Sequence, residues 1–163
     1  MRPIVEKIYE ANFVVSGSIK NNNFPLSEHK RITKVQWISQ FRDYKHEIQL
    51  GMKKHTPTDF SEKPDRFALQ NVTNFCKVKD LAFEILRITN SEEETHYFRK
   101  KIKIPFTFIG KDRILDFKNS YFLLSENAII VGLDSTLLYE AFGRGFRVAF
   151  LSLRSHFIND SSY

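Results

Sequence analysis

A chain of 163 residues is long enough for one ordinary hydrophobic core, and its 42% hydrophobic and 27% charged residues are typical of a folded globular protein. No apolar run approaches the ~20 residues that a membrane-spanning helix needs. Glu6 and Glu10 also interrupt the N-terminal region that a signal peptide would keep apolar. We therefore expect a cytoplasmic protein.

The single cysteine, Cys76, excludes an internal disulfide and a zinc site built from several cysteines. The five histidines include no pair at helical ligand spacing, so we expect no metal and no cofactor. The formal net charge of +6 favours an anionic partner, such as a nucleotide, a phosphorylated lipid, a membrane surface or a nucleic acid. Charge alone does not select among these partners.

The first part of the chain contains two candidate strands. Residues 12–15 alternate weakly and enter a Ser-Gly-Ser loop, as a short strand would. Residues 19–33 are polar and basic and indicate a linker, and the apolar run VQWIS, Val35 to Ser39, predicts a strand. Residues 43–65 hold glycine and proline without clear periodicity, so we expect a long loop with some helix.

The middle of the chain alternates between helix and strand patterns. Residues 66–79 carry apolar side chains at the spacing of an amphipathic helix, and LAFEILRI, Leu81 to Ile88, predicts a strand. Ser91 followed by three glutamates has the composition of a helix start, with basic residues at the far end near Lys101.

The C-terminal part continues this alternation. A short apolar piece at 105–109 ends at Gly110, and a helix is expected around 116–125. Apolar runs at 128–131 and 148–151 flank a further helical segment, and their lack of alternation fits strands buried on both faces. Strands alternating with helices predict an α/β domain with a mostly parallel sheet.

The triplet Asp134-Ser135-Thr136 stands where a buried strand gives way to a helix. Helix N-termini beyond the carboxyl ends of parallel strands present unpaired N–H groups that suit phosphate, and small hydroxyl side chains there would add donors. The same three residue types are also favoured N-caps that bind nothing. Asp134 itself would repel phosphate unless its carboxylate turned aside. Spacing leaves both interpretations open.

Glu140 lies one helical turn beyond Thr136 and could accept hydrogen bonds from a ribose diol. It also lies four residues before Arg144, where the alternative is an exposed ion pair worth only ~0.3–0.5 kcal/mol. Gly143 and Gly145 are expected to end the helix. The dinucleotide, Walker A, serine-hydrolase and zinc-protease motifs are absent.

The stretch LDSTLLYEAFGRGFRVAFL resembles the donor-side motif of bacterial surface-carbohydrate (polysaccharide or lipopolysaccharide) biosynthesis proteins, which are similar to two-domain GT-B glycosyltransferases. VQWISQFR, Val35 to Arg42, resembles the first strand of their C-terminal domain. The resemblance implies a Rossmann-like three-layer fold and an incomplete GT-B half. Residues 1–32 would be the tail of a preceding domain and a linker, and residues 33–163 a nucleotide-sugar-binding domain truncated at its C-terminus.

In that family pattern, Ser135 and Thr136 would contact the donor phosphates and Glu140 the ribose or sugar hydroxyls. Asp134 would shape the loop, and Arg42 could reach the same crevice. The reaction implied is metal-independent transfer of a sugar from a nucleotide-sugar to an anionic glycan or lipid acceptor. The acceptor domain, which would supply the base, is missing here, so the chain alone is not expected to be active.

Two other functions fit the composition. One is a non-catalytic α/β binding or assembly module whose basic surface docks an anionic partner. The other is nucleic-acid binding, suggested by the charge and the many aromatic residues. The aromatic residues lie mostly in apolar runs typical of a core, and no recognised reader motif is present, which argues against nucleic acid.

Overall fold

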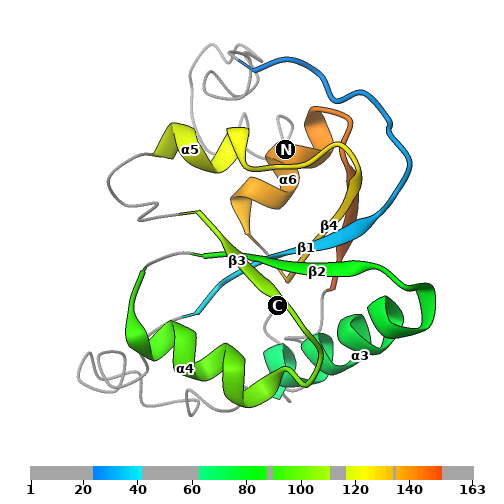
Figure 1. Cartoon of the computed structure of the whole chain (residues 1–163). Coiled ribbons are helices and arrows are strands. Elements are labelled where there is room, and N and C mark those ends of the chain that lie inside the picture. Colours follow the sequence, from blue (N-terminus) through cyan, green and yellow to red (C-terminus); the bar gives the residue numbers. More distant parts are fainter. Residues whose placement is uncertain (1–23, 42–62, 88–89, 111–116, 134, 152–163) are drawn as a thin grey trace, which may run out of the picture.

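The protein is described by a computed structural model for residues 24–41, 63–87, 90–110, 117–133 and 135–151 (Figure 1). Five parallel strands form one sheet in the order β3-β2-β1-β4-β5. The strands are β1 (Lys34–Ile38), β2 (Ala82–Leu86), β3 (Thr107–Ile109), β4 (Ala128–Gly132) and β5 (Arg147–Phe150). This is an α/β arrangement of the Rossmann-like kind, which confirms the expected fold class.

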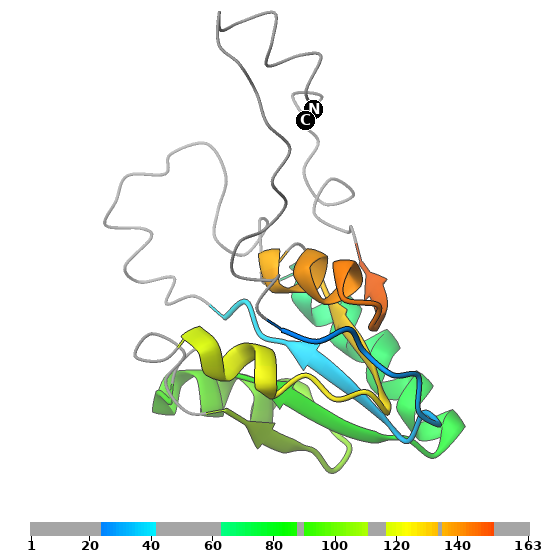
Figure 2. The ribbon, with the colours of Figure 1, turned by 90° about the horizontal axis from the view of Figure 1, so that it is seen from above.

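Helices cover both faces of the sheet. They are α3 (Lys63–Lys79), α4 (Glu92–Lys101), α5 (Phe117–Phe122) and α6 (Thr136–Gly143). Figure 1 shows α3 and α4 on one side of the strands and α5 and α6 on the other, and Figure 2 shows the sheet between these layers from above. The result is a three-layer domain.

The central strand β1 shows why the core has two halves. Successive side chains of a strand point to opposite faces. Val35 and Trp37 join the cluster under α3 and α4, whereas Ile38 joins the cluster under α5 and α6. Because strands buried on both faces need apolar side chains at successive positions, the run VQWIS forms the middle of the sheet rather than an edge.

Gln36 is the polar exception within β1, and it is buried. Its side-chain amide donates to the Leu123 carbonyl (3.1 Å) and to Glu84 Oε2 (2.9 Å), and its Oε1 accepts from the Ser125 backbone N–H (2.8 Å). These bonds tie the connection between α5 and β4 to the middle of the sheet. Burial of this amide is therefore compensated by its partners.

Most predicted elements are confirmed. The strand expected at 35–39 is β1, and the helix expected at 66–79 is α3, which begins three residues earlier. The helix predicted from Ser91 to about Lys101 is α4, and the Ser91 side chain accepts a hydrogen bond from the Glu94 backbone N–H. The strand at 12–15 and residues 43–62 of the loop expected at 43–65 lie outside the described residues, and residues 63–65 belong to α3.

One strand was not predicted, and one expectation for a strand needs correction. The apolar piece at 105–109 contains a three-residue strand, β3, which the pattern did not indicate. Strand β5 was expected to be buried on both faces, but it lies at the edge of the sheet and its residues are partly exposed. An edge strand has a neighbour on one side only, so its apolar side chains are covered less completely.

Candidate functional site

The strand order reverses between β1 and β4, which is the topological switch point of the sheet. Chain connections diverge there, so ligands of open α/β folds bind in the crevice beyond the carboxyl ends of these strands. Ser39 follows β1 at this edge, and Leu133 and Ser135 follow β4. The predicted triplet therefore stands at the carboxyl end of a strand that borders the switch point.

Ser135 occupies the N-cap position of α6, with extended backbone angles (φ −66°, ψ 135°). Its side chain makes no capping hydrogen bond. Thr136, the first helical residue, is exposed. The hydroxyl of Ser135 is therefore not used to satisfy the first turn of the helix. Asp134 and Arg42 lie outside the described residues, so their predicted roles stay predictions.

Glu140 faces helix α5. The Tyr121 hydroxyl donates to Glu140 Oε2 at 2.7 Å. Burial, together with this hydrogen bond and the charge of Glu140, raises the pKa of Tyr121 to about 12. The structure thus ties the Glu140 carboxylate to Tyr121, and a ribose contact would have to compete with that bond.

The alternative interpretation of Glu140, an exposed ion pair with Arg144, does not hold, because Arg144 is not exposed. Arg144 is buried, with only 6% of its surface exposed. Its Nε donates to the Pro25 carbonyl at 3.2 Å, because the segment that precedes β1 in sequence folds across the end of α6. Sequence spacing along one helix could not indicate this long-range contact.

The C-terminal end of α6 agrees with the prediction that a glycine ends this helix. Gly145 has a positive φ of 83°, and its N–H donates to the Phe142 carbonyl at 2.9 Å. The Phe146 N–H donates to the Ala141 carbonyl at 3.1 Å. This is the Schellman arrangement, in which a left-handed residue after the helix satisfies its last carbonyls.

A buried carboxylate that the sequence did not single out lies beside the switch point. Glu94 of α4 is fully buried, and its Oε1 accepts from Ser39 Oγ at 2.5 Å. Ser39 Oγ also accepts from the Phe41 N–H at 3.2 Å. The run of three glutamates indicated a helix start, but not that its third member turns inward to the end of β1.

Arg87, which follows β2, fixes the start of α4 from the other side. Its guanidinium donates to Asn90 Oδ1 (2.7 Å), to the Ser91 carbonyl (3.3 Å) and to Thr95 Oγ1, and its Cζ lies 4.2 Å from the centre of the Phe108 ring. Arg87 and Glu94 thus anchor the first turns of α4 to the carboxyl ends of β2 and β1.

In the part of the chain that the structure describes, no group of three histidine, cysteine or acidic side chains could hold a metal ion, and no helix is both long and apolar enough to cross a membrane. Two cavities, of about 490 and 510 Å³, flank α4 and are lined by polar and charged residues such as His96.

Residues 3–163 match the model of a protein family described as "putative O-antigen biosynthesis protein". The chain belongs to this family. No curated protein and no solved structure gives a significant match. The part of the sequence resemblance that concerns surface-carbohydrate biosynthesis is thereby confirmed.

Proposed function

We propose that this O-antigen biosynthesis protein binds a nucleotide-sugar and provides the donor half of a glycosyltransferase. The observation that carries the proposal is the position of Ser135, which follows β4 beside the switch point and keeps its hydroxyl out of the helix cap. Family membership supplies the carbohydrate context. The strand order supports a crevice of the kind that binds nucleotides in Rossmann-like sheets.

The proposed roles rest on the described positions of Ser135, Thr136 and Glu140, and on the sequence resemblance alone for Arg42 and Asp134. Ser135 and Thr136, with the N–H groups at the start of α6, would donate hydrogen bonds to the donor phosphate. Arg42 would reach the same crevice from the end of β1, and Asp134 would shape the connecting loop. Glu140 would bind ribose only after exchanging its Tyr121 partner, so we expect it to contribute less than the two hydroxyl groups.

The chemistry proposed is transfer of the sugar from its phosphate to an acceptor hydroxyl on an anionic glycan or lipid. The donor half contributes by fixing the position of the sugar and by stabilising the negative charge that develops on the leaving phosphate. No step requires a metal ion, because backbone and hydroxyl donors perform the stabilisation. The base that removes the acceptor proton would come from an acceptor domain.

A thermal-shift panel with CMP, CDP, UDP, GDP and their sugar conjugates tests the proposal. A ligand present at about 100 times its Kd stabilises the folded state by ~2.7 kcal/mol, which is easily measured as a rise in Tm. The Ser135→Ala/Thr136→Ala double variant removes both proposed hydroxyl donors. Thr107→Ala, an exposed threonine on β3 away from this edge, is the matched control.

The proposal predicts that one nucleotide stabilises the wild type and Thr107→Ala equally, and stabilises the double variant much less. Equal stabilisation of the double variant would remove Ser135 and Thr136 from the site. Weak stabilisation by every anion would favour the non-catalytic binding module. Strongly salt-dependent binding without preference for a nucleotide base would favour nucleic acid.

A further inference from the structure

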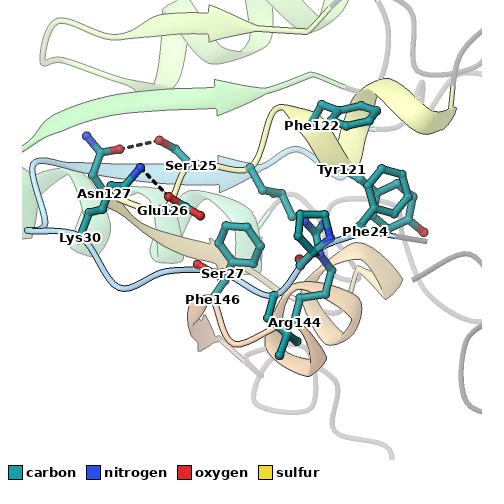
Figure 3. Close-up of a pocket in the computed structure, with 13 residues that line it drawn as sticks. Phe24, Ser27, Lys30, Tyr121, Phe122, Ser125, Glu126, Asn127, Arg144 and Phe146 are labelled. Carbon is teal, nitrogen blue, oxygen red and sulfur yellow. Dashed lines mark hydrogen bonds and ion pairs between the residues drawn. The ribbon is translucent and has the colours of Figure 1, made fainter. Parts of the chain in front are cut away.

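A third cavity lies at the opposite edge of the sheet, near the amino ends of β4 and β5. It has a volume of about 450 Å³. Figure 3 shows it between the segment that begins at Phe24, the end of α5, the turn before β4 and the connection from α6 to β5. The aromatic and cationic side chains that line it are Phe24, Lys30, Tyr121, Phe122, Arg144 and Phe146.

Arg144 is the central charged group of this cavity. Its Cζ lies 5.1 Å from the centre of the Phe24 ring, 5.9 Å from that of Tyr121 and 5.0 Å from that of Phe146. Aromatic faces attract a cation through their quadrupoles, but they do not accept a full set of guanidinium hydrogen bonds. The guanidinium therefore stands in an aromatic enclosure.

The hydrogen bonds of Arg144 are incomplete. Nε donates to the Pro25 carbonyl, whereas Nη1 is buried without a partner. Within residues 24–41, 63–87, 90–110, 117–133 and 135–151, no carboxylate forms an ion pair with Arg144. Burial lowers the pKa of this guanidinium, and the nearby charge of Glu140 only partly offsets that effect. A buried cation with an unused donor is costly unless an anion joins it.

The enclosure is held in shape by its own contacts. The Ser27 N–H donates to the Arg144 carbonyl at 2.7 Å. The Phe24 ring stacks on Tyr121, with ring centres 4.5 Å apart and planes 16° from parallel. These contacts order the aromatic rings around the guanidinium.

The mouth of the cavity combines an exposed ring with a cation. Phe122 is 72% exposed, although its ring contacts Phe24 edge-on at 5.1 Å. Lys30 pairs with Glu126 at 2.7 Å across the rim, as Figure 3 shows. An exposed aromatic face offers a stacking surface for the C–H groups of a sugar ring. Lys30 could turn from Glu126 to an incoming anion at little cost, since exposed ion pairs are weak.

We propose that this cavity binds an anionic sugar, meaning a monosaccharide that carries a phosphate or a carboxylate. The anionic group would take the unused Nη1 donor of Arg144, and the sugar ring would stack on Phe122. Because Nη1 is covered in the present conformation, binding includes a turn of the Phe24 ring or of the guanidinium. The cavity is separate from Ser135 and Thr136, which lie at the other edge of the sheet, although its Tyr121 is hydrogen-bonded to Glu140.

The test is a titration of the full chain, followed by NMR or calorimetry, with glucose 1-phosphate, glucuronate, glucose and inorganic phosphate. Arg144→Gln removes the charge, and Arg66→Gln, an exposed arginine on α3, is its matched control. Phe122→Ser removes an exposed ring and is not expected to disturb folding. It keeps the proposal testable if Arg144→Gln does not fold.

Binding of either anionic sugar, at least tenfold tighter than glucose, supports the proposal, and the sugar that binds distinguishes phosphate from carboxylate. That binding should weaken at least tenfold in Arg144→Gln and several-fold in Phe122→Ser, and stay unchanged in Arg66→Gln and in Ser135→Ala/Thr136→Ala. No binding at millimolar concentration, full binding in both cavity variants, or equal affinity for inorganic phosphate and glucose 1-phosphate would overturn the proposal.

Discussion

Replacing Glu94 by glutamine is expected to weaken the attachment of α4 to the carboxyl end of β1. Glu94 is fully buried, and its carboxylate accepts the Ser39 hydroxyl at 2.5 Å. Glutamine has nearly the same shape and can still accept this bond. However, it loses the charge and brings an NH₂ group into a position where the carboxylate only accepted hydrogen bonds.

The magnitude follows from the class of hydrogen bond. A bond to a charged group contributes about 1.5–3 kcal/mol, so Glu94→Gln should lower the free energy of unfolding by about 2 kcal/mol. For a chain of this length that corresponds to a fall in Tm of roughly 4–8 °C. Ser39→Ala should cost a similar amount. Because both changes alter the same contact, the double variant should lose less than the sum of the two.

Urea unfolding of the four proteins measures this coupling, and Glu93→Gln is the matched control. Glu93 is exposed and lies in the same first turn of α4, so it has the same favourable interaction with the helix dipole. The difference between the two glutamine variants therefore measures the buried interactions of the Glu94 side chain, and the double variant with Ser39→Ala measures the part that Ser39 contributes. Equal losses for Glu93→Gln and Glu94→Gln, or strict additivity of Ser39→Ala and Glu94→Gln, would refute the reasoning.

Three further predictions concern other parts of the fold. Gly145→Ala should destabilise the folded protein by ~1–2 kcal/mol, because Gly145 has a positive φ. Gly143→Ala lies inside helix α6 and should be neutral or stabilising. Thermal melts compare the two variants, and an equal loss of stability in both would contradict this prediction. Burial raises the pKa of the Cys76 thiol to about 11. This thiol should therefore react with a disulfide reagent at pH 8 only as fast as the protein opens, and rapid labelling would contradict the prediction. The pKa of Tyr121 in the folded protein lies above its ordinary value of 10.0. Its contribution to the free energy of unfolding is therefore fully present below pH 10 and is lost as pH rises towards 12. Wild type should therefore lose stability relative to Tyr121→Phe across that range, and parallel pH profiles would exclude the effect.

The elements that were predicted well are those with a strong local signal. Helix α4 could be located because Ser91, three acids and a basic end all follow from the electrostatics of a single helix. Strand β1 could be located because it is central and apolar at successive positions. Strand β3 was missed because three partly exposed residues carry too little pattern, and β5 was misjudged because an edge position depends on the order of the whole sheet.

The site was less predictable because its contacts join distant parts of the chain. The triplet at Ser135 was found from its place between strand and helix, which is local information. The burial of Glu94 depends on Ser39, which lies 55 positions earlier and reaches it across the sheet. The burial of Arg144 depends on Pro25 and Ser27, more than a hundred residues away in sequence. The spacing of residues along one helix predicts neither the burial of Glu94 nor that of Arg144.

The most direct test of the account is an assigned ¹H–¹⁵N NMR titration of the full chain with CMP, CDP, UDP and GDP. We predict that one nucleotide perturbs amides at the carboxyl ends of β1 and β4, at Ser39 to Phe41 and at Ser135 and Thr136. Perturbations that avoid Ser135 and Thr136, or that gather around Arg144 at the opposite edge, would contradict the proposed nucleotide-sugar site.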